Sequence, residues 1–225
     1  MEQNSQFISK EKYHRNLKFV VLETILTSIG AGFSVATITI FWNSIGMNQT
    51  DIGFVQMAFT IAICLLDIPL GYIADRFNRK ILNIIGDIGV ALVFALYAFS
   101  KNMYMALLSE CLLGLFLAMT NGVDQSFIKT NCDKIDKTGE LFKKVNVKIH
   151  TVRYIAMLIV TIVGGFIAKY SIRLSIGISF APYFIGGLIA FKIYDYSDKL
   201  DAKHSNPLKD MIHSIKEVLK EINIF

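Results

Sequence analysis

Six apolar stretches, each about as long as a membrane-crossing helix, constrain this chain more than any other feature. A helix needs about 20 mostly apolar residues to cross the hydrocarbon core of a bilayer. Hydrophobic residues make up 53% of the 225-residue chain and its mean hydropathy is +0.49, values typical of a polytopic membrane protein. We therefore expect an all-α integral membrane protein with six transmembrane helices. The expected spans are residues 19–41, 52–74, 81–100, 103–125, 149–170 and 174–194.

The distribution of Lys and Arg along the chain predicts how these spans are oriented. Basic residues crowd the N-terminal tail, the connections 75–80 and 126–148, and the tail after residue 194. The alternate connections hold only Lys101 and Arg173, with Lys169 at a span edge. The positive-inside rule then places both termini in the cytoplasm. Because topology accounts for the net charge of +5, no nucleic-acid partner is expected.

A short charged connection between the second and third spans carries a recognisable pattern. It reads Gly-Tyr-Ile-Ala-Asp-Arg-Phe-Asn-Arg-Lys, from position 71 to position 80. This resembles the signature loop of the major facilitator superfamily of secondary transporters, Gly-x-x-x-Asp-Arg-x-Gly-Arg-Arg/Lys, which lies between the same two helices. The matching residues are Gly71, Asp75, Arg76, Arg79 and Lys80. Asn78 stands where the family has Gly, and Asn is the next most tolerant residue of a left-handed turn.

The resemblance implies a fold and a set of partners for the chain. In this family six helices form one half of a twelve-helix transporter, as two inverted three-helix repeats. Residues 1–18 would be a cytoplasmic tail, 19–195 the six-helix bundle in the plasma membrane, and 196–225 a linker toward a second half. The implied partners are a small-molecule substrate, a proton or other cation, membrane lipid and a second six-helix half, from the same chain or a dimer mate.

The C-terminal tail has the pattern of an amphipathic helix along the cytoplasmic surface. Asn206 and Pro207 suit the N-cap and the first helical position. Apolar residues then recur at helical spacing up to Ile222, with Lys, Asp and Glu between them.

Ionisable residues inside spans are costly, at about 2.5–3.5 kcal/mol each on insertion scales, so each needs a reason. Glu23 begins a small, polar face in the first span, which lines the central cavity in this family. We expect it to bind substrate or a proton; the alternative is an interfacial carboxylate paired with Arg15 or Lys18. Asp67, with Pro69, is expected to shape a helix bend, and Asp87 to serve packing or a pair with the basic loop.

Glu110 lies in the fourth span, where many family members have an arginine implicated in proton coupling. Glu110 has a negative charge where that arginine has a positive one, and this leaves two alternatives open. Glu110 could itself carry a proton, or it could be a structural partner of Arg153, the intramembrane cation of the fifth span. With Glu23 and Asn121, Glu110 is expected to line the substrate or proton cavity.

The resemblance also implies a gate near the signature loop. Asp124, at the end of the fourth span, would pair with Arg79, and Asp75 would cap a helix of the second half; the alternative for Asp124 is a solvated helix-end acid. The expected gating residues are Gly71, Asp75, Arg76, Arg79, Lys80 and Asp124.

The predicted function is secondary active transport of a small organic solute by alternating access, as proton-coupled efflux. The alternative is a non-transporting six-helix scaffold or a truncated half-transporter. Gly164-Gly165 resembles a fragment of an antiporter motif, but the Pro of that motif is absent, and close helix packing through small residues is the preferred explanation of the pair. The protein is not expected to be an enzyme or to hold a cofactor, because hydrolase, metalloprotease and phosphate-loop motifs are absent. No metal is expected either, because no Cys-x-x-Cys spacing exists and all four histidines lie outside the spans or at an edge.

Overall fold

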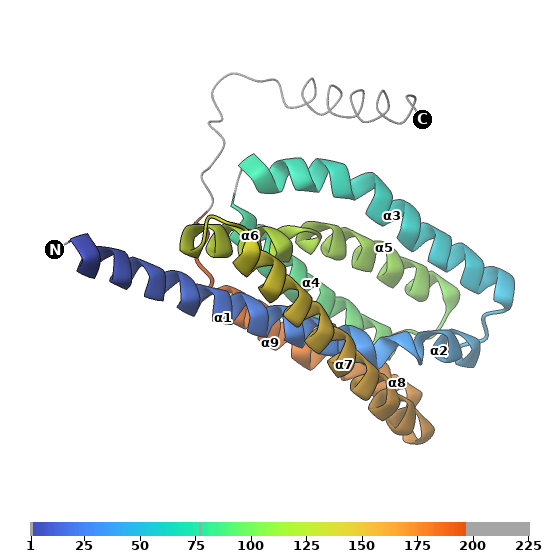
Figure 1. Ribbon diagram of the computed structural model, residues 1–225. Coiled ribbons are helices and arrows are strands. Elements are labelled where there is room, and N and C mark those ends of the chain that lie inside the picture. Colours follow the sequence, from blue (N-terminus) through green and yellow to red (C-terminus); the bar gives the residue numbers. More distant parts are fainter. Residues whose placement is uncertain (1, 77, 197–225) are drawn as a thin grey trace, which may run out of the picture.

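The computed structural model describes residues 2–76 and 78–196, which form α-helices without β-strands (Figure 1). The all-α prediction is confirmed for this part of the chain. The helices are α1 (Glu2–Val35), α2 (Ile38–Ser44), α3 (Gln49–Arg76), α4 (Arg79–Phe99), α5 (Met103–Thr120), α6 (Val123–Ile135), α7 (Glu140–Tyr170), α8 (Ile172–Gly177) and α9 (Phe180–Ala190). The amphipathic helix expected beyond residue 206 lies outside the described residues.

Six segments of the described chain are long and apolar enough to cross a membrane. They are Lys10–Val35, Gln49–Gly71, Arg79–Phe99, Met103–Ile135, Glu140–Tyr170 and Ile172–Ala190. Each overlaps one of the six stretches expected from hydropathy, so the prediction of six candidate spans is confirmed.

The helices break inside three of the expected spans. The breaks fall at residues 36–37, 121–122 and 178–179. At the second break, Gly122 adopts a φ of 75°, a left-handed conformation that side chains with a Cβ rarely adopt. The chain then continues as α6 through much of the expected loop 126–148. It stays helical because Phe127, Ile128 and Cys132 recur at helical spacing and are buried against the bundle.

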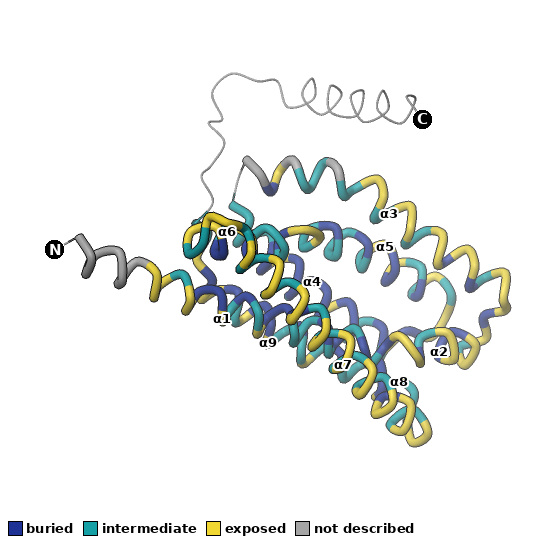
Figure 2. Tube along the Cα trace, viewed as in Figure 1, coloured by how far each residue is buried: buried dark blue, intermediate teal, exposed yellow. Residues whose placement is uncertain are grey.

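Two helices form the centre of the bundle. α1 packs on α6, α7 and α9, while α4 packs on α5 and α9, and α3 joins the bundle through α5 (Figure 1). α4 is the most buried of the six candidate spans, whereas α3 and α7 are largely exposed (Figure 2). Their exposed side chains are mostly apolar, which suits contact with lipid or with another part of a membrane protein.

Close packing between α4 and α5 depends on a residue without a side chain. A Cβ atom at Gly86 would lie 2.9 Å from the carbonyl oxygen of Phe116 and would overlap the side chain of Thr120. Small residues at such points allow membrane helices to approach each other closely. Gly86 therefore sets the distance between these two helices.

Two apolar cores lie on either side of a polar layer. One core surrounds Trp42, Val90 and Tyr97, and the other surrounds Val20 and Phe127. Between them along α1 and α4 come buried polar side chains. Their position between two apolar cores means that water reaches them only through a cavity.

The turn before α4 differs from the expectation for Asn78. Its backbone is extended, with φ −125° and ψ 102°, and its side-chain oxygen accepts a hydrogen bond of 3.0 Å from the Lys80 N–H. The expected left-handed turn at this position is therefore wrong. Asn78 is the N-cap of α4, a role that Asn fills as well as any residue.

Candidate functional site

Three acidic side chains from different helices meet in the polar layer. Glu23 of α1 and Asp87 of α4 are 1% and 3% exposed, and Asp124 of α6 is half-buried with its Oδ1 shielded from solvent. The carboxyl group of Glu23 contacts the carboxyl groups of both others. We call Glu23, Asp87 and Asp124 the carboxyl cluster.

Local sequence explains how these side chains reach one face. Asn83 and Asp87 are four residues apart, so they lie one above the other on α4. The side-chain amide of Asn83 donates a hydrogen bond of 3.3 Å to Oε1 of Glu23. On α1, Thr24 and Ser28 have the same spacing next to Glu23, and the Ser28 hydroxyl donates to the Thr24 carbonyl at 2.6 Å. α1 thus presents one continuous polar face to α4 and α6.

Arg153 of α7 brings a positive charge to the cluster. Its Nε donates a hydrogen bond of 2.8 Å to the hydroxyl of Ser28, and its charge acts on Asp124. The cluster thus joins three acidic groups to one guanidinium. If all three acids were ionised, the group would carry two uncompensated negative charges inside the membrane-spanning region, which is strongly unfavourable.

Several oxygen atoms in this layer lack a hydrogen-bond donor among the described residues. They are Oε2 of Glu23, Oδ2 of Asp87, Oδ1 of Asp124 and Oδ1 of Asn83. Buried acceptors that face each other without a donor are costly, because each has lost its hydrogen bonds to water. A proton among them would supply one hydrogen-bond donor and lower the excess negative charge by one.

A cavity of about 190 Å³ adjoins the cluster. Asp87, Asp124, Arg153 and Tyr183 are among the residues that line it. Gly186 of α9 lets that helix pack closely on α1 beside the cluster, since a Cβ there would lie 3.1 Å from Cγ2 of Thr27. The cavity gives water or a small solute access to the cluster.

The other two residues expected to line a cavity lie in different surroundings. Asn121 lines the cavity beside the cluster, and its amide also donates a hydrogen bond of 2.9 Å to Asp67 of α3. Glu110 of α5 is 4% exposed and accepts a hydrogen bond from the hydroxyl of Tyr97. Glu110 and Arg153 therefore have separate hydrogen-bond partners, and neither is the other's structural partner in this structure.

The signature loop connects to two other helices. Arg79 donates a hydrogen bond of 2.5 Å to the hydroxyl of Ser126 in α6, and Lys80 Nζ donates one of 2.7 Å to the carbonyl oxygen of Phe191, just past α9. The side chains of Asp75 and Arg76 lie outside the described part of the structure. Gly71 has open space around the position of a Cβ.

Sequence reasoning missed part of this site. Asp87 was expected to serve packing or a pair with the basic loop, but it lies in the carboxyl cluster because α4 occupies the centre of the bundle. Asn83 and Tyr183 were not expected at a site. The four-residue spacing of Asn83 and Asp87 in an apolar span was the signal that could have found Asn83.

The chain matches the model of one protein family and resembles several known proteins. A model described as Major Facilitator Superfamily matches residues 20–223. An uncharacterized MFS-type transporter of Methanocaldococcus jannaschii is 21% identical over 80% of this chain and 39% of its own length. An uncharacterized MFS-type transporter of Bacillus subtilis is 26% identical over 68% of this chain and 91% of its own length.

A third relative matches a shorter stretch. Protein Zinc Induced Facilitator 1 of Arabidopsis thaliana is 38% identical over 64 residues, which are 28% of this chain and 13% of that protein. The chain thus spans well under half of the archaeal and plant relatives. Two of these three relatives are named as transporters.

Proposed function

The chain belongs to the major facilitator superfamily, and we propose that it works as a secondary active transporter of a small organic solute, driven by protons. It is a multi-pass membrane protein of a transporter family. Solute would bind between this bundle and a second six-helix half, supplied by the same full-length chain or by a dimer mate. Alternating access would then expose the solute to each side of the membrane in turn.

The carboxyl cluster is the observation that carries the proposal of proton coupling. Three acids, one guanidinium and several acceptor oxygens without donors form a place where one proton changes both the charge and the hydrogen bonding. Glu23 lies at its centre, since its carboxyl group contacts those of Asp87 and Asp124. The adjoining cavity supplies the route by which a proton reaches these groups.

We propose a gating role for the signature loop and its contacts. The connection from α3 to α4 contains Gly71, Asp75, Arg76, Arg79 and Lys80. Of these, Arg79 donates a hydrogen bond to Ser126 in α6, and Lys80 donates one to the carbonyl oxygen of Phe191, just past α9. The contact from Arg79 reaches α6, the helix that carries Asp124. A movement of the loop would therefore displace α6, and with it Asp124 of the carboxyl cluster.

The proposed topology has both termini in the cytoplasm and two inverted three-helix repeats in the plasma membrane. The alternation of basic and weakly charged connections supports this orientation. Export is the direction we propose, on the resemblance of Gly164-Gly165 to an antiporter motif. Only Gly164 of this pair packs closely: a Cβ there would lie 3.0 Å from the carbonyl oxygen of Phe33, whereas Gly165 has open space around it.

Untargeted mass spectrometry of small solutes tests the proposal whichever solute is carried. Cells that express the protein are compared with cells that lack it, inside and in the medium, with and without nigericin in potassium medium to remove the pH gradient. We expect at least one organic solute to be depleted inside and enriched outside. This difference should disappear with nigericin and in Glu23→Gln.

The control is Glu140→Gln, which removes an exposed acid at the start of α7. It should export the solute as the unmodified protein does. If no solute changes on expression, the proposal of transport fails. If a solute changes but neither nigericin nor Glu23→Gln affects it, transport stands and proton coupling at the cluster is wrong. Enrichment inside the cells would instead contradict export.

A further inference from the structure

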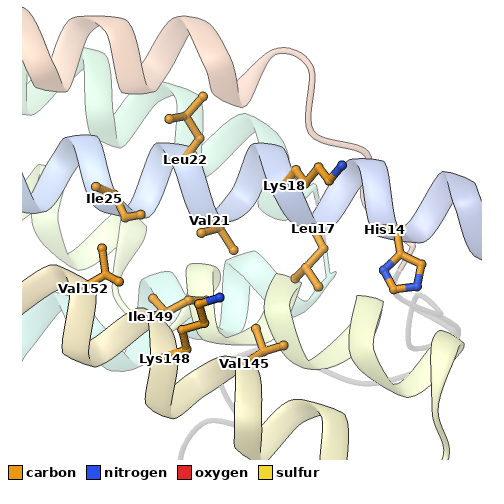
Figure 3. Close-up of a pocket in the computed structure, with 10 residues that line it drawn as sticks. All are labelled: His14, Leu17, Lys18, Val21, Leu22, Ile25, Val145, Lys148, Ile149 and Val152. Atoms are coloured by element: carbon orange, nitrogen blue, oxygen red, sulfur yellow. The ribbon is translucent and has the colours of Figure 1, made fainter.

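An apolar groove bordered by basic side chains lies between α1 and α7, away from the carboxyl cluster (Figure 3). Its volume is about 420 Å³. Aliphatic side chains from both helices form its walls, among them Val21 and Ile149. The other lining residues are His14, Lys18 and Lys148, which are exposed. The groove is therefore amphipathic, with apolar walls and basic side chains from both helices along it.

Basic and apolar residues alternate along both helices. On α1, Leu17 lies between His14 and Lys18, and on α7, Lys148 lies between Val145 and Ile149. Figure 3 shows the amino group of Lys148 in the space between the helices, near Val21, and that of Lys18 directed toward the end where His14 lies. α1 and α7 run side by side, so basic groups from both helices border the groove.

The two lysines are not neutralised within the described structure. Neither Lys18 nor Lys148 has an ion-pair or hydrogen-bond partner among the described residues. One acid, Glu11, lies nearby, but Lys12 and Arg15 flank it and keep this end of α1 cationic. An anion that entered the groove would therefore find two unpaired ammonium groups along it.

We propose that this groove binds an anionic phospholipid, with the phosphate between Lys18 and Lys148 and an acyl chain along the apolar walls. Charge complementarity is the reason to assign the occupant: basic pockets between membrane helices on the cytoplasmic side bind anionic headgroups. The wall residues Leu22 and Val152 are exposed, so the groove is open at the surface of the described bundle. The proposal rests on the proposed topology, which places these basic residues near the cytoplasm, but it does not depend on transport or on the carboxyl cluster.

The two lysine charges determine how strongly the groove prefers an anionic lipid. The acyl chain contributes little to this preference, because it moves from the apolar bilayer into an apolar groove. Each lysine near an anionic lipid surface favours binding several-fold, so two lysines should favour phosphatidylglycerol over phosphatidylcholine roughly tenfold or more. The apolar walls add selectivity for a molecule that has a chain as well as a phosphate.

Native mass spectrometry of the purified protein, with defined amounts of the two lipids, measures this preference. The double variant Lys18→Gln/Lys148→Gln should bring the preference for phosphatidylglycerol close to one. The matched control is Lys129→Gln/Lys143→Gln, which removes two exposed lysines that do not line the groove. The control should keep the full preference.

A second variant tests the apolar part of the groove. Val152→Trp fills the space without changing the charge, and because Val152 is 38% exposed the bundle should tolerate it, as an unchanged melting temperature would verify. We expect this variant to lower phosphatidylglycerol binding several-fold.

Three outcomes would overturn the proposal. In the first, the control lysine variant lowers binding as much as the groove variant, so the surface charge as a whole attracts the lipid. In the second, Val152→Trp has no effect, so no chain lies in the groove. In the third, glycerol 3-phosphate competes as well as the intact lipid, so the basic groups bind a free phosphate.

Discussion

Gly86→Ala is the sharpest test of how the centre of the bundle is packed. The substitution adds one Cβ atom on the face of α4 that meets α5. That atom would lie 2.9 Å from the carbonyl oxygen of Phe116, 3.3 Å from Cβ of Met119 and still closer to Thr120. The side chain of Thr120 can rotate, but the carbonyl oxygen of Phe116 belongs to the backbone of α5 and moves only with the helix.

The size of the effect follows from these distances. Carbon atoms pack at about 3.5–4.0 Å, so α4 and α5 must separate by roughly half an ångström to relieve the contact. Overpacking of this kind costs about 1–3 kcal/mol. Because 1.4 kcal/mol is about a tenfold change in an equilibrium constant, the ratio of folded to unfolded protein should fall about 5- to 150-fold.

Thermal unfolding and denaturant titration of the purified protein in micelles measure the loss. The control is Gly165→Ala on α7, where nothing lies within 4 Å of the new atom. Alanine favours a helix over glycine by up to about 1 kcal/mol, so the control should be neutral or stabilising. Equal stabilities of the two variants would refute the close approach of α4 and α5 at this position.

Two further predictions concern buried hydrogen bonds. The side-chain amide of Asn16 donates hydrogen bonds to the carbonyl oxygen of Tyr194 at 2.8 Å and to Oδ1 of Asn131 at 3.0 Å, and it accepts one from the Tyr194 N–H at 2.7 Å. Asn16→Ala removes all three, so unfolding titrations should show that the free energy of unfolding falls by about 1–3 kcal/mol. Tyr97→Phe leaves the carboxyl group of Glu110 buried without its donor and should cost a similar amount. Adding Glu110→Leu should recover part of that loss in a double-mutant cycle, and strict additivity would show that the pair does not interact.

The sequence predicted the candidate spans because their signal is local. Each apolar run is long enough on its own to specify a helix in lipid, whatever its neighbours are. The continuation of the fourth span into α6 was missed, since Lys129 and Asp133 make that stretch look like a loop although one of its faces is apolar.

Which acids meet was harder to predict, because it depends on how each helix is rotated in the bundle. Glu110 and Asp87 both lie in apolar spans, and nothing in the local sequence indicates that one faces Tyr97 and the other Glu23.

The conformation of Asn78 was also hard to predict from the sequence. Asn suits both a left-handed turn and an N-cap, and the free N–H of Lys80 at the start of α4 decides between them.

The order of the cluster's members along the chain has a consequence for biosynthesis. Glu23 is made with the first span, Asp87 with the third and Asp124 with the fourth, whereas Arg153 follows only with the fifth. The acidic helices therefore enter the membrane before the guanidinium that balances them exists. Because an unbalanced acid facing lipid is costly, the early helices must stay together, or with the insertion machinery, until the fifth has been synthesised.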